Sequence, residues 1–351
     1  MADVPSLAAR LATVPSLVAA SDHRADARRA ALLADFAIPG ASRPTDRERA
    51  LVSALLRGSI RSIASEIVAA ASYELDDAAT LASEEAVERR AISALLTDGD
   101  MADALIAAAR TAVIDEELAL LRTPDRQPHL LATLLEHREP QVAERARDYL
   151  LAENTARSPD LAGGAPLPAA LHRRLCWTVA ASLRAVASPS TQSRDRALAN
   201  AATVVIRRHA TRVEPLSAAV RLAQVLEPRA DEAAVLLHDA LVEARVTLFV
   251  ALLARLVGLP ADEVRAIVLD AEGELPWLAL RALPIAREDA ARIGFLLCEA
   301  DPARDVEQLP DVLDTVWQVS PEQARAALAP LSLHTDFRGA IRRIALREGG
   351  Q

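Results

Sequence analysis

The feature that most constrains this chain is the recurrence of apolar residues at helical spacing from one end to the other. Residues three or four positions apart lie on one face of an α-helix, so the pattern is typical of amphipathic helices. Ala and Leu together make up more than a third of the sequence, and Pro and Gly interrupt it at short intervals. Val and Ile fall inside the helical pattern rather than in alternating runs. The sequence therefore predicts an all-α chain of about sixteen helices and no strand.

Several helix ends are marked by particular residues. Thr45-Asp46-Arg47-Glu48 and Ser320-Pro321-Glu322-Gln323 are typical of capping boxes at helix starts. Gly258 stands where a helix is expected to end. Residues 157–168 hold three Pro and two Gly and cannot continue a helix. We therefore expect a linker at 157–168 between a helical domain at 1–156 and a second one at 169–351.

Residues 134–146 are expected to form a helix, a tight turn at Pro140 and a second helix. Residues 260–265 and 321–325 repeat the second half of this unit, with Pro at a helix start and Arg four or five residues later. Such pairs suggest a fold of stacked helix pairs, a HEAT-like α-solenoid. An N-terminal helical bundle ahead of the array is an arrangement that the pattern also allows.

Four segments, at 45–71, 134–151, 167–183 and 231–297, carry helix patterns and phrases such as Leu256-Val257-Gly258-Leu259-Pro260. Together they resemble a family of bacterial proteins known as the domain of unknown function 2336. The resemblance implies an all-helical, HEAT-like fold. It brings no catalytic residues with it.

The stretch from Thr45 to Tyr73 is the longest strong helix of the sequence. Its apolar residues form a narrow stripe of the kind found in coiled coils, made of Val52, Leu56, Ile60, Ile63 and Ile67. The stripe is either a core face within one chain or a seam through which two copies form a homodimer.

The charge balance weighs against a broad nucleic-acid surface. The chain has 49 acidic and 40 basic residues and a net charge of -9, whereas duplex affinity depends on clustered cations. All the basic residues are Arg. Without Lys, neither a Schiff base to a side chain nor a P-loop lysine is available.

No known catalytic motif occurs in the sequence. The seven His are scattered, and no two of them are three or four residues apart, as ligands on one helix face would be. His172 lies beside Arg173 and Arg174. We expect it to be an inert, solvated residue near a helix start, and the alternative is that it faces an anion. Asp115-Glu116-Glu117 is expected in the first turn of a helix. We therefore predict no metal, no cofactor and no enzymatic activity.

The last expected helix has Phe337 and Ile341 on one side and Arg residues on the other. It is expected to dock by its apolar side and to show a basic face, a candidate for binding an anion or a partner, formed by Arg338, Arg342, Arg343 and Arg347. The three Trp residues lie among Leu and Val and are expected in the core: Trp177, Trp277 and Trp317. The alternative for Trp277 is a half-exposed side chain.

No signal peptide is visible at the N-terminus, and the most apolar run, residues 246–259, is too short to span a bilayer. The expected location is the cytoplasm, without membrane insertion. The favoured function is a non-enzymatic scaffold that binds another protein through a helical-repeat surface. The alternatives are a nucleic-acid-associated HEAT-like protein and an enzyme of unrecognised type.

Overall fold

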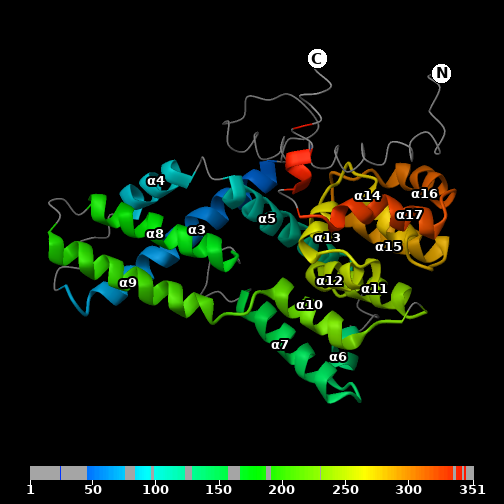
Figure 1. Cartoon of the computed structure of the whole chain (residues 1–351), viewed down its shortest axis with the longest axis horizontal. Coiled ribbons are helices and arrows are strands. Elements are labelled where there is room, and N and C mark those ends of the chain that lie inside the picture. The colour runs from blue at the N-terminus through cyan, green and yellow to red at the C-terminus, as the bar shows by residue number, and fades with distance from the viewer. Residues whose placement is uncertain are drawn as a thin grey trace. The chain divides into compact units, whose positions relative to one another are not determined.

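The computed structural model describes residue 24 and residues 46–75, 84–95, 99–122, 129–156, 167–186, 191–229, 231–334, 337–341 and 344. This part of the chain consists of helices and connections and contains no strand (Figure 1). The predicted all-α fold is therefore confirmed. The helices are α3 (Asp46–Ala71), α4 (Glu84–Leu95), α5 (Gly99–Leu120), α6 (Leu130–Leu135), α7 (Pro140–Ala156), α8 (Ala169–Val186), α9 (Gln192–Ala210), α10 (Pro215–Leu226), α11 (Ala233–Val242), α12 (Val246–Val257), α13 (Ala261–Val268), α14 (Leu275–Arg281), α15 (Arg287–Ala300), α16 (Leu309–Trp317) and α17 (Pro321–Leu328), with short 3₁₀ turns η3 (Val306–Gln308) and η4 (Ala329–Ser332).

The chain forms two compact units, each assembled from separate stretches of sequence. The first unit comprises residues 1–27, 111–147 and 219–351, and the second comprises residues 28–110 and 148–218. These boundaries differ from the predicted domains at 1–156 and 169–351, and most of the linker predicted at 157–168 lies outside the described residues. A linker was expected there because Pro and Gly end helices, but a break in a helix need not be a break between cores.

The core of the second unit is built around α3, which packs against α4, α8 and α9 (Figure 1). The stripe on α3 supplies this core: Ile60, Ile63 and Ile67 are at most 3% exposed, Val52 is buried and Leu56 is partly buried against it. The stripe is thus covered by helices of its own chain. The expectation of a homodimer seam formed by these residues is wrong, because the surface that it needs is already buried.

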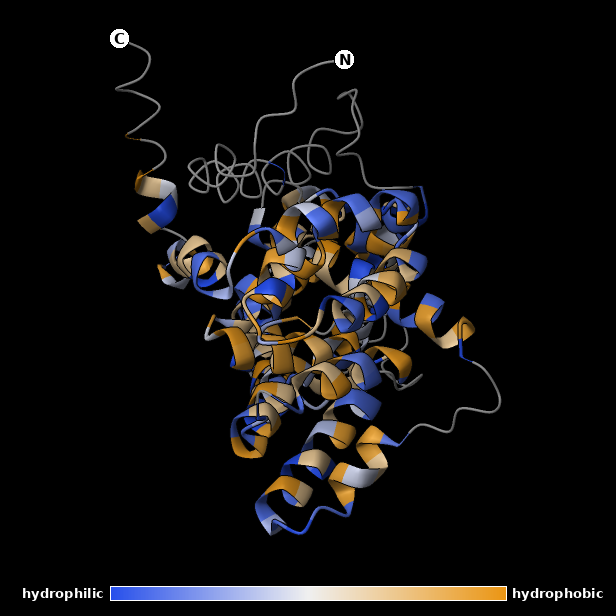
Figure 2. Cartoon of the chain, turned by 90° about the vertical axis from the view of Figure 1, so that its right-hand side faces the viewer, coloured by the Kyte–Doolittle hydropathy of each residue, from blue (hydrophilic) through white to orange (hydrophobic). Residues whose placement is uncertain are grey.

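The core of the first unit is built around α12. Eight of its twelve residues are buried, including Phe249 and the run from Val250 to Ala254. Many helices of the chain carry both hydrophobic and hydrophilic residues (Figure 2), and a helix with so large an apolar share belongs inside a protein. No helix in the described part of the chain combines the length and hydropathy needed to cross a membrane.

Consecutive helices from α11 to α16 pack against one another, as the predicted helix pairs require. However, α11 also contacts α15, and α14 also contacts α17. In an open solenoid each repeat contacts only its neighbours. The solenoid arrangement therefore stays a prediction.

The helix ends predicted at Ser320 and Gly258 are found there, whereas Thr45 of the other predicted capping box lies outside the described residues. Ser320 and Gln323 form a reciprocal capping box at the start of α17. Gly258 ends α12 with a φ of 72°, the left-handed conformation that glycine adopts without strain. α6 ends before the turn that leads to Pro140, the first residue of α7.

Charged side chains join helix ends within the first unit. Asp115 lies in the C-terminal half of α5, and its carboxylate accepts a hydrogen bond of 2.9 Å from the backbone N–H of Val246, at the start of α12. The expectation that residues 115–117 open a helix is therefore wrong. A carboxylate does favour a helix N-terminus, but the helix that Asp115 caps belongs to another part of the chain.

Replacing Ile67 by Asp should unfold the second unit rather than dissociate a dimer. Ile67 is fully buried, and an unpaired carboxylate in an apolar core costs several kcal/mol. Ala69→Asp on the exposed side of α3 is the matched control and should change the free energy of unfolding by less than about 0.5 kcal/mol. Urea unfolding followed by circular dichroism measures both variants. A folded Ile67→Asp protein with a smaller sedimentation coefficient would instead restore the dimer seam.

Candidate functional site

A small pocket of about 90 Å³ lies within the second unit. Its walls come from α3, the end of α7, the start of α8, the end of α9 and the turn before α10. The lining residues that carry polar or charged side chains are Ser59, Ser62, Glu66, Thr155, His172, His209, Arg212 and Glu214. This is the strongest concentration of potential chemistry in a described cavity, and it lies beside the apolar core.

Two imidazole rings stack face to face in the pocket wall. The ring centroids of His172 on α8 and His209 on α9 are 3.4 Å apart, and the ring planes differ by 5°. His172 is buried, and its Nδ1 lies 3.5 Å from Sγ of Cys176, one helical turn further along α8. Parallel rings at this distance cannot both be cationic without strong repulsion. The stack therefore requires at least one neutral ring.

Burial lowers the pKa of His172 to about 3, with further lowering by His209 and by the guanidinium of Arg212. Burial is also the main reason that the pKa of His209 is lowered, and Arg212 adds to it, while the hydrogen bond to Leu167 opposes it. Both imidazoles are accordingly neutral at physiological pH.

The thiol of Cys176 is not poised for nucleophilic chemistry. Burial raises its pKa to about 12, and the nearby carboxylate of Glu66 raises it further. The thiolate is the reactive form of cysteine, so a thiol in this environment is inert at neutral pH. The cluster of Cys176, His172 and His209 is thus suited to binding rather than to covalent catalysis.

The tautomer of His209 follows from its contacts. Its Nε2 lies 3.3 Å from the backbone carbonyl oxygen of Leu167. A carbonyl can only accept a hydrogen bond, so in the neutral ring Nε2 carries the proton and Nδ1 carries a lone pair. Nδ1 is buried and has no hydrogen-bond partner among the described residues. The wall of the pocket therefore contains a buried acceptor, closed off from solvent, without a donor among the described residues.

The sequence had placed His172 in solvent, and this is wrong because its side chain is buried. His172 also pairs with a cysteine, Cys176, which lies four residues further along the same helix face. The spacings between His residues do not reveal this pair. The spacing between His172 and Cys176 was a readable signal. The approach of His209 was not, because it depends on how α8 packs against α9.

Among the described residues, no group of three or more His, Cys, Asp or Glu side chains is arranged to hold a metal ion.

Two of the three Trp residues that were expected in the core differ in their burial. Trp177 on α8 is 43% exposed rather than part of the core, whereas Trp277 is buried, with Arg304 5.5 Å from its ring centroid.

A groove on the first unit runs along α11 and α15, which lie in contact. Its volume is about 740 Å³. Two large apolar side chains in its wall are exposed to solvent, Val235 at 61% and Phe295 at 50%. Charged residues from both helices line the same groove: His238 and Asp239 on α11, and Asp289 and Arg292 on α15.

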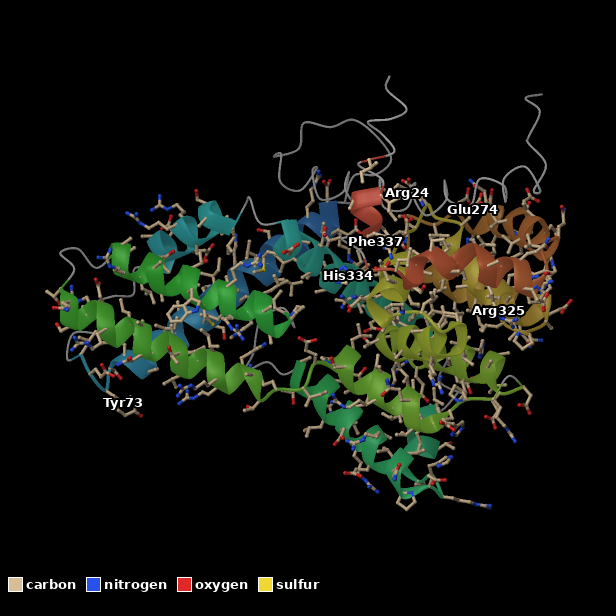
Figure 3. The ribbon with its side chains drawn as sticks, in the orientation of Figure 1. Arg24, Tyr73, Glu274, Arg325, His334 and Phe337 are labelled. Carbon is tan, nitrogen blue, oxygen red and sulfur yellow. The ribbon has the colours of Figure 1, made fainter. Side chains whose placement is uncertain are left out.

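The expected basic face at the C-terminal end is wrong at Arg338, the only one of its four residues that the structure describes. Arg338 is buried, and its Nη2 donates a hydrogen bond of 2.6 Å to Oε2 of Glu263. Phe337 (labelled in Figure 3) and Ile341, which were expected to dock, are instead exposed. Arg342, Arg343 and Arg347 lie outside the described residues, and Arg338 is buried because it binds carbonyl groups as well as a carboxylate.

Comparison of the chain with protein-family models, with curated proteins and with solved structures found no match. The resemblance to the 2336 family therefore stays a prediction. The pocket and the groove are the two features of the described chain from which the proposed function is inferred.

The two buried His should make the second unit unstable in acid. Below about pH 6.5 the unfolded chain binds protons that the folded His172 does not bind until about pH 3, so stability falls as the pH is lowered through this window by about 1.4 kcal/mol per pH unit. His172→Phe should remove the part of this slope that His172 contributes and leave the part that comes from His209, whose pKa is also lowered. Urea unfolding at a series of pH values measures it, and His137→Phe, a change at an exposed His, should leave it intact. Equal slopes in wild type and His172→Phe would contradict a neutral buried His172.

Breaking the ion pair of Arg338 and Glu263 should destabilise the first unit. Arg338→Met leaves Glu263, whose side chain is 14% exposed, without its cation, which costs about 3 kcal/mol or more. Glu263→Gln combined with Arg338→Met should recover part of this loss. A double-mutant cycle of urea midpoints gives the coupling energy. Full additivity of the two changes would show that the side chains do not interact.

Proposed function

We propose that this chain is a non-enzymatic interaction protein that holds a partner protein in the groove along α11 and α15. The observation that carries the proposal is the exposure of Val235 and Phe295 in one groove. Large aromatic and aliphatic side chains that line a concave surface are typical anchors of protein interfaces. The packing of consecutive helices from α11 to α16 supports the HEAT-like form of this proposal, in which helices expose a binding surface.

The charges of the groove define the partner's chemistry. His238 Nδ1 lies 3.2 Å from Oδ1 of Asp239, and Arg292 Nη1 lies 3.1 Å from Oδ1 of Asp289. About a third of each carboxylate side chain stays exposed in these pairs. Carboxylates at the edge of an apolar groove favour a partner that inserts an apolar side chain flanked by a basic residue.

The state of the pocket residues supports the non-enzymatic part of the proposal. The thiol of Cys176, with its pKa near 12, and the neutral His172 offer neither an activated nucleophile nor an efficient base near pH 7. We place the protein in the cytoplasm, since its most apolar helix, α12, forms a buried core.

Phe295→Arg should abolish capture of the partner, because it fills the groove with a cation that repels a basic partner residue. Phe295 is half exposed, so the variant should keep its circular dichroism spectrum and melting temperature. Tyr73→Arg is the matched control, since Tyr73 is 91% exposed on the second unit and extends away from the helices (Figure 3).

The measurement is quantitative affinity capture from native lysate with tagged wild type and both variants. A protein retained by wild type and Tyr73→Arg but lost from Phe295→Arg supports the proposal. Retention of every captured protein by Phe295→Arg would contradict it. Direct binding of duplex DNA by the purified wild type at physiological salt would favour the nucleic-acid alternative instead.

A further inference from the structure

Positive charge is concentrated on the pair of helices α8 and α9. Residues 169–213 contain eight Arg and a single acidic residue, Asp195, although the whole chain has a net charge of -9. α8 packs against α3, α4 and α9, and α9 packs against α3 and α8, so the two helices run side by side (Figure 1). Their sides that point away from α3 form one outer surface. We call it the hairpin face, and it consists of Trp177, Val204 and six exposed arginines, Arg173, Arg174, Arg184, Arg196, Arg207 and Arg208.

Most of these cations are not neutralised by the protein. In the described part of the chain, no ion pair or hydrogen bond engages the guanidinium groups of four of them, Arg173, Arg196, Arg207 and Arg208. Arg174 lies 3.6 Å from Asp100 and Arg184 lies 2.8 Å from Asp195, yet both Arg side chains stay about half exposed, at 48% and 55%. A third carboxylate, that of Glu74, contacts α9 as well. The remaining charge favours a partner with several negative groups.

An exposed aromatic ring lies among these cations. Trp177 is 43% exposed, and Arg173 and Ala181 are exposed one turn before and after it on the same side of α8. The methyl side chain of Ala181 is too small to cover an indole ring. The hairpin face therefore combines a free aromatic surface with guanidinium groups close to it, which is the combination that stacks on an unpaired base and binds the phosphates beside it.

We propose that the hairpin face binds single-stranded nucleic acid. The arginines contact successive phosphates, and Trp177 stacks on a base. A duplex keeps the faces of its bases stacked inside the helix, so it gains only the contacts to phosphate. An anionic membrane surface takes up many apolar side chains, whereas Trp177 and Val204 are the only large apolar residues exposed in the described parts of α8 and α9.

The hairpin face belongs to the second unit, and the groove along α11 and α15 belongs to the first. Binding of a nucleic acid on the hairpin face thus goes beyond the proposed function and does not depend on it. Substitutions in one unit test one proposal and serve as controls for the other.

The test is fluorescence anisotropy of a labelled deoxythymidine oligonucleotide of about 20 nucleotides, titrated with the full chain at a series of salt concentrations. We expect saturable binding, and a plot of log affinity against log salt with a slope of about -3, because each phosphate contact of the four unpaired arginines contributes about -0.7 on a single strand. Absence of saturable binding by the folded protein at low salt would overturn the proposal.

Arg207→Gln combined with Arg208→Gln should make this slope shallower by about 1.4, since two phosphate contacts are lost. Arg138→Gln combined with Arg255→Gln is the matched control. It removes the same charge from two exposed arginines of the first unit and should keep the slope of the wild type. An equal effect of both double variants would show that binding does not occur on the hairpin face.

Trp177→Ala should weaken binding about tenfold or more, because a stacked base loses its platform, and Trp177→Phe should restore most of the affinity. Phe295→Ala, at an exposed aromatic residue of the first unit, should have no effect. The oligonucleotide should also quench indole fluorescence in the wild type but not in Trp177→Phe. Equal affinity of Trp177→Ala and the wild type, or equal affinity of the wild type for the duplex or for phosphatidylglycerol vesicles, would contradict recognition of a single strand.

Discussion

A helix leaves the N–H groups of its first turn and the C=O groups of its last turn without partners, and a chain of many short helices repeats this cost at every end. In the first unit, side chains from other helices provide hydrogen-bond partners for these groups. Glu243 accepts hydrogen bonds from the N–H groups of Leu130 and Leu131 at the start of α6. Arg122 donates to the carbonyls of Val242 and Glu243 at the end of α11. Acids at N-terminal ends and arginines at C-terminal ends thus join the short helices.

The same principle explains why some arginines of the described part of the chain are buried or partly buried. Arg304 donates to the carbonyl oxygens of Val268 and Asp270 beyond α13, and Arg281 donates to that of Val319 beyond α16. A planar guanidinium can reach two carbonyls at once and pack its face on a ring, which a lysine ammonium cannot do. With no lysine in the sequence, arginine performs every such role.

The sequence predicted what depends on local periodicity. The stripe of α3, the end of α12 at Gly258 and the capping box at Ser320 all follow from residues that are close together in the chain. It did not predict what depends on packing between distant segments. Asp115 caps a helix that begins far along the sequence, and His209 stacks on His172 only because α8 and α9 lie side by side. Composition alone could not assign these contacts.

Each unit contains one free cysteine, Cys176 in the second and Cys298 in the first, and both are buried. Burial raises the pKa of both thiols, so little thiolate is present in the native state. Alkylating reagents therefore react with these sulfurs only after the structure around them opens locally. The rate of modification at each sulfur then reports how often the unit around it opens. A pulse of reagent followed by peptide mass spectrometry would read the two opening equilibria separately from one unlabelled, unmutated sample.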